Sequence, residues 1–288
     1  MEPQAILLLV IAAFAHSGWN LLAKKSLDKQ AFLWLSLLAT LAVLAVPFWY
    51  LYTPLPADVW LLVLASGVLE AIYFMLLSTA YDHGDLSLVY PLARGSAPLF
   101  VTVFAAIFLS ERPSQGGMLG ILLIVAGIYT LHLRSLDLRG LYAPLHSLRQ
   151  KASQLAILVG VTIASYSVVD KAGVMHANPL VYIYPVFVVA TLLMTIYIVL
   201  VKRATVPREW RVNRFSVIAV GILSPLAFLL VLTALTVSHV SYVSSVREMS
   251  VVVAAALGTL VLREPFGKAK ILGAVLIFAG VVSIALAA

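Results

Sequence analysis

The sequence predicts an all-α integral membrane protein of about ten transmembrane helices, arranged as two inverted five-helix repeats. Three observations lead to this expectation. Hydrophobic residues make up 62% and charged residues only 11% of the 288 residues, whereas soluble domains are about half apolar and a quarter charged. Apolar runs of roughly 18 to 24 residues recur along the chain, long enough to cross a hydrocarbon layer of about 30 Å as helices. The two halves of the chain also resemble each other.

The first half contains five apolar runs separated by short polar breaks. The first run follows "MEPQ", which has neither a basic segment nor a cleavage site, so we expect a retained span rather than a signal peptide. The later breaks contain charges, prolines or glycines, as in "KKSLDK", "TPLPAD" and "ERPSQG", and prolines and glycines of this kind mark loops. The expected spans cover residues 4–22, 31–51, 59–80, 86–109 and 116–131.

The longest connection, residues 132–152, is basic and divides the chain into two halves. Five more apolar runs follow it, at residues 153–173, 180–201, 216–237, 240–262 and 267–287. We therefore expect a first five-helix repeat at 1–131, a basic cytoplasmic connection at 132–152 and a second five-helix repeat at 153–288. No segment has the composition of a soluble domain.

Lysine and arginine are concentrated in every second connection. The sparse connections hold only Arg112 and Lys171, and two further arginines lie inside spans. Basic connections stay on the cytoplasmic side of a membrane. We therefore expect a multi-pass protein of the cell (inner) membrane with both termini on the extracytoplasmic side. The basic set comprises Lys24, Lys25, Lys29, Arg134, Arg139, Arg149, Lys151, Lys202, Arg203, Arg208, Arg211, Arg214, Arg263, Lys268 and Lys270.

Internal similarity relates the two halves. Arg94 aligns with Arg247 and Glu111 with Glu264, both at an offset of 153 residues, and "IVAGI" of the fifth span aligns with "IFAGV" of the tenth. Because each half has an odd number of spans, the second copy is inverted in the membrane. Transporters are often built from inverted repeats of this kind.

These features resemble the drug/metabolite transporter superfamily, in particular its ten-span EamA branch. The resemblance covers essentially the whole chain. Besides the related halves, it is carried by an acidic residue with proline between the last two spans of each half ("SERP", "REPF"), a glycine-rich final span and "HSGWN" in the first span. It implies an alternating-access carrier with a central cavity between the repeats, often an exporter of amino acids or other small metabolites. The YddG-like exporters of aromatic amino acids are the nearest group.

Two arginines inside the spans are candidate substrate-binding or gating residues. A charge near the bilayer centre costs about 2.5 to 3.5 kcal/mol on insertion scales, so it should face a partner or a wet cavity. Arg94 and Arg247 lie roughly 10 to 12 Å below opposite surfaces, at 1.5 Å per residue. They either line the pathway, where a guanidinium binds a carboxylate bidentately or pairs with a gating acid, or snorkel to the interface or tie helices together.

Glu248 makes the two repeats unequal, because Gly95 occupies the equivalent position in the first repeat. Adjacent residues on a helix do not face each other, so Glu248 cannot neutralise Arg247. We expect Arg247 to pair with Asp170 instead, and Glu248 to face either the cavity or another helix.

Glu70 and Asp170 are the expected proton-coupling residues. Glu70 lies near the middle of the third span, in "SGVLEAIYF", with Tyr73 one turn further along the same face. A carboxylate facing an apolar cavity at this depth can exchange a proton near neutral pH. The alternative for Glu70 is a protonated carboxyl that only forms a hydrogen bond between helices.

A polar cluster in the first span is the expected cavity wall. His16, Trp19 and Asn20 lie on adjacent turns of one face, and histidine changes charge in the physiological range. At an offset of 150 residues, Tyr166 corresponds to His16 and Asp170 to Asn20. A packing role for His16 and an interfacial position for Trp19 are the alternatives.

Three further tyrosines complete the candidate set. Tyr90 is expected to add aromatic lining to the cavity. Tyr182 and Tyr184 are the other candidates for this lining, but we expect them in the aromatic belt at the membrane interface.

Enzyme signatures are missing from the sequence. It contains no phosphate-binding loop, dinucleotide motif, metal cluster or nucleophile motif, and no cysteine. We expect a secondary active transporter without cofactor or metal, and in particular a proton-linked exporter of small metabolites such as amino acids. Its expected partners are a small-molecule substrate, protons and the lipid bilayer, with no nucleic acid. A carrier of cationic or quaternary compounds and a lipid-carrier flippase are the alternatives.

Overall fold

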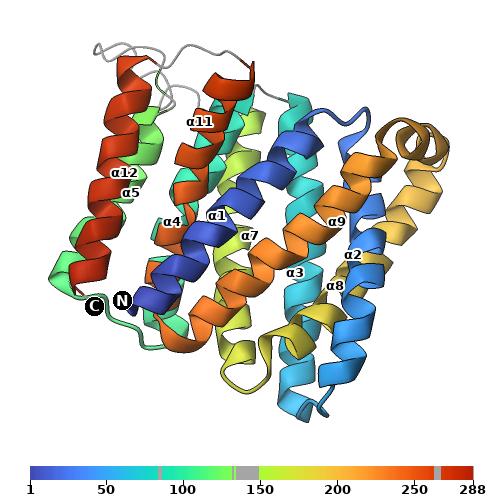
Figure 1. Cartoon of the computed structure of the whole chain (residues 1–288), viewed down its shortest axis with the longest axis horizontal. Coiled ribbons are helices and arrows are strands. Elements are labelled where there is room, and N and C mark those ends of the chain that lie inside the picture. Colours follow the sequence, from blue (N-terminus) through green and yellow to red (C-terminus); the bar gives the residue numbers. More distant parts are fainter. Residues whose placement is uncertain (84–85, 132, 134–148, 263–266, 288) are drawn as a thin grey trace.

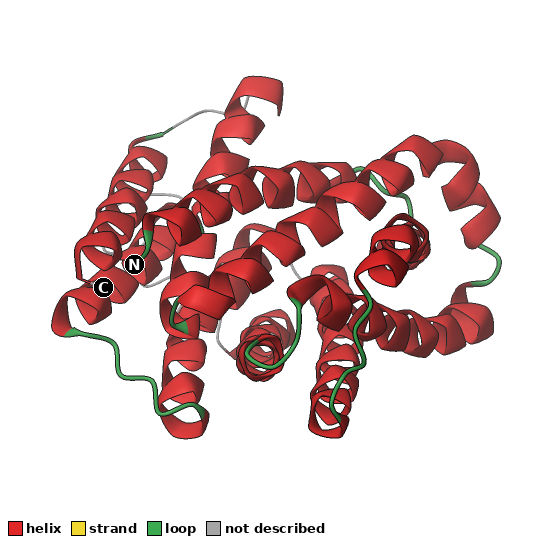
Figure 2. Ribbon diagram, turned by 60° about the horizontal axis from the view of Figure 1, so that its bottom comes forward, coloured by secondary structure: helices red, strands yellow, loops and turns green. Residues whose placement is uncertain are grey.

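The computed structural model describes residues 1–83, 86–131, 133, 149–262 and 267–287, without the side chains of residues 24, 81–82, 86–88, 90–91 and 257–262. In this part of the chain, all regular secondary structure is helical (Figures 1 and 2). The first half contains α1 (Pro3–Lys24), α2 (Lys29–Leu51), α3 (Ala57–His83), α4 (Leu86–Phe108) and α5 (Gln115–Leu131). The second half contains α7 (Lys151–Val174), α8 (Pro179–Tyr197), the π-helical turn η2 (Ile198–Lys202), α9 (Val206–Val237), α10 (Val240–Arg247), α11 (Met249–Leu262) and α12 (Lys268–Ala287).

These elements make ten membrane crossings, which confirms the predicted fold class. Seven of the described helices are long and apolar enough to cross a membrane by length and composition, and α4 and α5 contribute shorter apolar segments. Most ends lie within three residues of the expected bounds. The exception is α9, which begins at Val206 instead of 216. Its first turns, "VPREWRVNRF", are too polar for hydropathy to detect, although they contain the buried Glu209.

The ninth crossing consists of two helices, where the sequence predicts one over residues 240–262. α10 ends at Arg247 and α11 begins at Met249, so Glu248 alone separates them. The Glu248 N–H donates to Ser245 O at 3.0 Å and the Val251 N–H donates to Glu248 O at 2.9 Å. Hydrogen bonds between residues three apart tighten a helical turn locally. Hydropathy does not detect the break because the apolar pattern continues beyond it.

The two halves run in opposite directions through the bundle. α1 starts at the end where both termini lie, and α7 starts at the opposite end (Figure 1). The helices α1, α3 and α5 correspond to α7, α9 and α12 of the second half. The contacts between the halves follow this relation, because α1 packs on α9, α7 packs on α3, and α5 packs on its own equivalent α12. The Met1 ammonium donates to Ala285 O at 3.4 Å. Both chain ends therefore lie together on one side of the bundle.

Glycines allow α5 and α12 to pack backbone against backbone. A Cβ atom on Gly120 would lie 2.7 Å from Gly280 O, and one on Gly127 would lie 2.7 Å from Gly273 O. Distances this short leave no room for a side chain. Small residues at such positions let membrane helices approach closely, and this pair forms one edge of the bundle (Figure 1).

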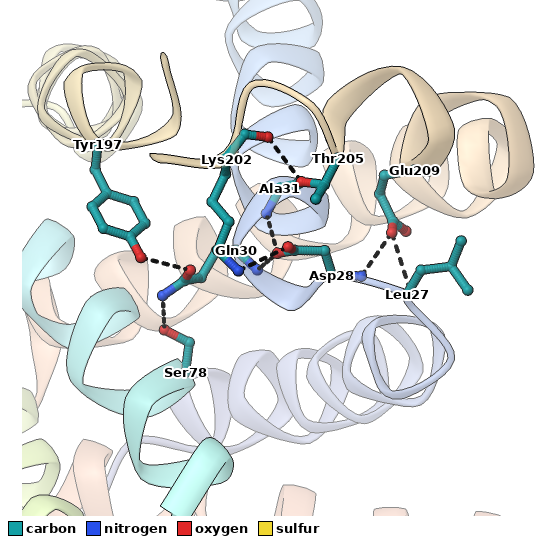
Figure 3. A network of polar contacts seen from close by, with 9 residues as sticks. All are labelled: Leu27, Asp28, Gln30, Ala31, Ser78, Tyr197, Lys202, Thr205 and Glu209. Atoms are coloured by element: carbon teal, nitrogen blue, oxygen red, sulfur yellow. Dashed lines mark hydrogen bonds and ion pairs between the residues drawn. The ribbon is translucent and has the colours of Figure 1, made fainter. Parts of the chain in front are cut away.

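Asp28 begins a polar network at the end of the bundle opposite the termini (Figure 3). As the N-cap of α2, its Oδ1 accepts hydrogen bonds from the N–H groups of Gln30 and Ala31, both at 3.1 Å. Its Oδ2 pairs with Lys202 Nζ at 3.0 Å. One carboxylate thus joins the start of α2 to the end of the seventh crossing.

The same network reaches α3, α8 and α9. Glu209 Oε2, at the start of α9, accepts the Asp28 N–H at 2.8 Å. The Gln30 amide donates to Ser78 Oγ of α3 at 3.0 Å and accepts from the Tyr197 hydroxyl of α8 at 3.1 Å. The ends of four helices are therefore held together by side chains at this end of the bundle (Figure 3).

Candidate functional site

A small cavity lies among α1, α3, α4, α7, α8, α9 and α10, so both halves contribute to its wall. Its volume is about 50 Å³, enough for a few water molecules but too small for a metabolite. The polar side chains that line it are His16, Glu70, Arg94, Ser224 and Arg247. The aromatic side chains that line it are Trp19, Tyr73, Phe74, Tyr166, Phe187 and Phe228.

The cavity brings together most of the site residues expected from the sequence. Among them, Asn20, Asp170 and Glu248 do not line it. The side chain of Tyr90 lies outside the described residues. The residues that do line it are His16, Trp19, Glu70, Tyr73, Arg94, Tyr166 and Arg247.

Arg94 and Glu248 form a buried ion pair between α4 and the break in the ninth crossing. Arg94 Nε lies 3.1 Å from Glu248 Oε2, and the two side chains are 5% and 0% exposed. Arg94 Nη2 also donates to Ser250 Oγ at 3.2 Å. Of the two alternatives for Glu248, the structure therefore shows the one in which it faces another helix. The ion pair links the first repeat to the second.

Arg247 does not pair with Asp170, contrary to the expectation from depth. Between these two described residues no ion pair is formed. Asp170 is 1% exposed, and its Oδ1 accepts hydrogen bonds from Ser66 Oγ at 2.5 Å and from the Tyr182 hydroxyl at 3.0 Å. Two hydroxyl donors thus occupy Asp170 behind the cavity wall. A rule based on depth fails here because it ignores the rotation of each helix about its axis.

Tyr182 is a core residue instead of an interfacial one. It is fully buried, and its ring lies against Gly173, where a Cβ would meet the ring edge. Its hydroxyl reaches Asp170 because Asn178, the N-cap of α8, starts the helix beside the end of α7. Tyr184, by contrast, is partly exposed and stacks on Phe48 with ring centroids 4.3 Å apart.

Of the polar cluster of α1, two residues line the cavity and the third forms a hydrogen bond within the helix. His16 and Trp19 line the cavity, and the Trp19 Nε1–H donates to His16 Nδ1 at 3.2 Å. Asn20 instead donates its amide to the His16 carbonyl at 2.8 Å, within the same helix. Between them, Ser17 Oγ lies 2.7 Å from Ser250 O of α11. α1 is thereby fixed to the helix that follows the break.

Glu70 faces the cavity, and within the described part of the chain its carboxylate forms no direct hydrogen bond or ion pair. Its side chain is 4% exposed. Tyr73, one turn on, lies beside Tyr166 with ring centroids 6.0 Å apart. A carboxylate in this setting can exchange a proton with water or a ligand in the cavity.

Several residues of the site carried no signal in the sequence. Phe74, Phe187 and Phe228 are apolar residues in apolar spans, so nothing distinguished them from residues that face lipid. Ser66 was also missed, although a hydroxyl in the third span could have been matched to the buried carboxylate of Asp170. Serine and threonine residues in predicted spans should therefore be considered as hydrogen-bond partners of charged residues in other spans.

Comparison with known proteins supports the same assignment. The sequence matches the EamA-like transporter family over residues 3–133 and 150–286. No curated protein matches it. The crystal structure of one protein superimposes with a TM-score of 0.80 at 17% sequence identity, covering 99% of this chain and 98% of the other, a likeness that establishes the fold alone. The chain therefore belongs to the EamA-like transporter family of the drug/metabolite transporter superfamily and is a multi-pass membrane transporter with two EamA repeats, not an enzyme.

Proposed function

We propose that the protein is a proton-linked secondary transporter that exports small amphipathic metabolites, with amino acids as the first candidates. The observation that carries this proposal is the cavity between the repeats. It holds a carboxylate, Glu70, and a guanidinium, Arg247, and neither forms an ion pair with the described residues. A zwitterion carries the two complementary charges, and the aromatic wall suits an apolar side chain.

The size of the cavity supports alternating access. A volume of about 50 Å³ excludes a bound amino acid, so the substrate must enter a more open arrangement of the same helices. Both repeats supply wall residues, so rocking of one repeat against the other changes the cavity directly. The small cavity corresponds to a closed state of this cycle.

Glu70 is the first proposed proton carrier and Asp170 the second. Glu70 can exchange a proton directly with the cavity. Asp170 is held by Ser66 and Tyr182, and release of either hydroxyl during the cycle would let it take up a proton. Cotransport of protons by buried carboxylates is a frequent use of ionisable residues in transmembrane helices.

Glu70→Gln tests the coupling. Purified protein in liposomes should lose transport of phenylalanine driven by a pH gradient, while exchange of labelled for unlabelled phenylalanine at equal pH persists, because the amide keeps the shape of the side chain but carries no proton. Asp58→Asn is the matched control, since Asp58 is an exposed carboxylate at the start of the same helix, and it should behave as wild type. Gradient-driven transport that survives in Glu70→Gln contradicts the role of Glu70.

A carrier of quaternary or other organic cations is the second candidate. Aromatic faces bind organic cations, and the cavity combines six aromatic side chains with the carboxylate of Glu70. For this function, tetraphenylphosphonium should raise the melting temperature of the purified protein more than phenylalanine does, and Glu70→Gln should abolish the increase. A larger shift with phenylalanine favours the amino-acid exporter.

A further inference from the structure

The two repeat-related arginines have different surroundings. Arg94 pairs with Glu248 at 3.1 Å and donates to Ser250 Oγ at 3.2 Å. Arg247 is 5% exposed and lines the cavity, yet its Nε and Nη2 have no hydrogen-bond partner among the described residues. Within those residues Arg247 also forms no ion pair.

The repeat alignment explains why Arg247 lacks the carboxylate and hydroxyl partners that Arg94 has. The offset of 153 residues that relates Arg94 to Arg247 also relates Gly95 to Glu248 and Ala97 to Ser250. Around Arg94, the second repeat supplies a carboxylate and a hydroxyl. At the positions equivalent by symmetry, the first repeat offers Arg247 a hydrogen atom and a methyl group. The inverted architecture therefore repeats the arginine but omits both of its partners on one side.

The two unpartnered nitrogens of Arg247 have a specific chemistry. Nε and Nη2 form one edge of the guanidinium plane, and two parallel N–H donors of this kind bind a carboxylate bidentately. A guanidinium does not lose its proton inside a protein, and a buried charge without a partner is costly. An anionic ligand in the cavity would remove that cost.

The surroundings of Arg247 restrict the ligand further. Glu248 is committed to Arg94, and Asp170 is committed to Ser66 and Tyr182. Arg247 is the cation available to a ligand, and it matches one negative charge on that ligand. Glu70 lines the same cavity and would repel a second negative charge on the ligand, while aromatic side chains make up the remaining wall. This combination fits a monocarboxylate with an apolar or aromatic body better than a dicarboxylate or a phosphate ester.

We propose that Arg247 alone provides the subsite for the carboxylate of a monocarboxylate substrate, and that Arg94 is a positioning residue that holds the broken ninth crossing through Glu248 and Ser250. This inference rests on the proposed function only in taking the cavity as the substrate site. It assigns unequal roles to two arginines that the sequence presents as equivalent.

Equilibrium binding to the purified protein tests the subsite with a matched pair of probes. 3-Phenylpropionate and 3-phenylpropionamide share a body, but only the first carries a carboxylate. A charge-assisted pair predicts that the wild type binds the carboxylate about tenfold to a hundredfold more tightly than the amide. Arg247→Gln should abolish this preference, Arg247→Lys should reduce it, and Arg94→Gln should retain it.

Melting temperatures without ligand provide an independent readout of the positioning role. Arg94→Gln leaves Glu248 buried without its cation, so it should melt below wild type, and the double variant Arg94→Gln/Glu248→Gln should recover part of the loss. Arg247→Gln breaks no ion pair among the described residues and removes a costly buried charge, so it should melt at or above the temperature of the wild type.

The outcomes separate the two proposals. The subsite is overturned if the wild type does not prefer the carboxylate, if Arg247→Gln and Arg247→Lys both keep the preference, or if Arg94→Gln alone removes it. Should Arg247→Gln not fold, Arg247→Lys decides, and an unchanged preference in that variant overturns the subsite. Binding is measured in detergent without a gradient, so it does not depend on proton coupling. If the carboxylate preference depends on Arg247 but the protein shows no proton-driven transport, the coupling proposal is refuted and the subsite proposal is retained.

Discussion

Asp28 illustrates how one side chain can fix several helices. It caps α2 through two backbone N–H groups and pairs with Lys202 at the end of the seventh crossing. The cap satisfies donors that have no partner within the helix. The ion pair adds a contact between segments 174 residues apart in sequence. Cap and ion pair can be separated, because asparagine caps a helix as well as aspartate does but carries no charge.

Substitution at Asp28 should therefore have graded effects. Asp28→Ala removes both interactions and should lower the free energy of unfolding by about 1 to 2 kcal/mol, mostly through the cap. Asp28→Asn removes only a partly exposed ion pair and should cost less than about 1 kcal/mol. Thermal unfolding in detergent at neutral pH measures the order. Equal losses in the two variants contradict the division into cap and ion pair.

Acid should remove the difference between wild type and Asp28→Asn. Burial raises the pKa of the Asp28 carboxyl, but the Lys202 ammonium and the N–H groups of Ala31 and Gln30 together hold that pKa below its ordinary 3.8. A carboxyl whose pKa is lower in the folded state stabilises the fold above its unfolded pKa, and this contribution is lost as the pH falls through the folded pKa. The difference in melting temperature should shrink below about pH 3.8, and a difference that grows there contradicts the assignment.

Individual site residues were predictable from sequence only where they were charged, polar or amphipathic aromatic residues. Glu70, Arg94 and Arg247 stand out because a charge inside a span must face a partner or a wet cavity. Their partners were not predictable, since pairing depends on how each helix is rotated about its axis. Asp170, for example, turns to Ser66 and Tyr182, a choice that depth in the membrane does not determine.

At the scale of elements, the two interruptions of regular α-helix differ in origin. η2 ends the seventh crossing at Lys202, next to the polar network at the end of the bundle. The break at Glu248 lies inside a crossing, where Arg94 reaches the carboxylate and the Ser250 hydroxyl. Freed backbone groups at such depth are tolerated where protein surrounds them. Hydropathy located both crossings correctly, but it does not show whether the α-helix is continuous within a crossing.

The contact between α5 and α12 should be sensitive to a single methyl group. Gly120→Ala places a Cβ 2.7 Å from Gly280 O and 3.0 Å from the Ile284 backbone nitrogen, so the helices must separate, at a cost of about 1 to 3 kcal/mol. Gly18→Ala is the matched control in α1, because its Cβ would meet only Leu223 Cδ1 at 3.6 Å, and alanine should stabilise the helix by about 0.5 to 1 kcal/mol. Melting temperatures that move in the same direction for both variants contradict the close packing.

At the scale of the whole molecule, the fold was largely predictable and its internal asymmetry was not. A bilayer fixes the length of a crossing and requires its backbone groups to be satisfied within the helix, so ten crossings follow from composition. The relation between the repeats then indicates which helices have equivalent neighbours: α1 packs on α9, and its repeat equivalent α7 packs on α3, the repeat equivalent of α9. Pairing of Arg94 with Glu248 breaks the symmetry, since Gly95 offers Arg247 no equivalent carboxylate.

Orientation in the membrane is a prediction that rests on charge. The connection at 109–114 lies at the end of the bundle with both termini, and α7 and α9 begin at the opposite end (Figure 1). The described basic residues at the ends of these helices, such as Lys151 and Arg208, therefore lie at that opposite end. Basic connections remain cytoplasmic, so both termini should face outward.

Because the chain contains no cysteine, single cysteine substitutions can report accessibility without background labelling. Thr53→Cys and Gln150→Cys replace exposed neutral residues at opposite ends and leave the basic residues unchanged. In intact cells, a membrane-impermeant maleimide should label Thr53→Cys alone, and permeabilised cells should show labelling of both, which controls for reactivity. Labelling of Gln150→Cys alone in intact cells would mean that the charge distribution does not set the orientation of this protein.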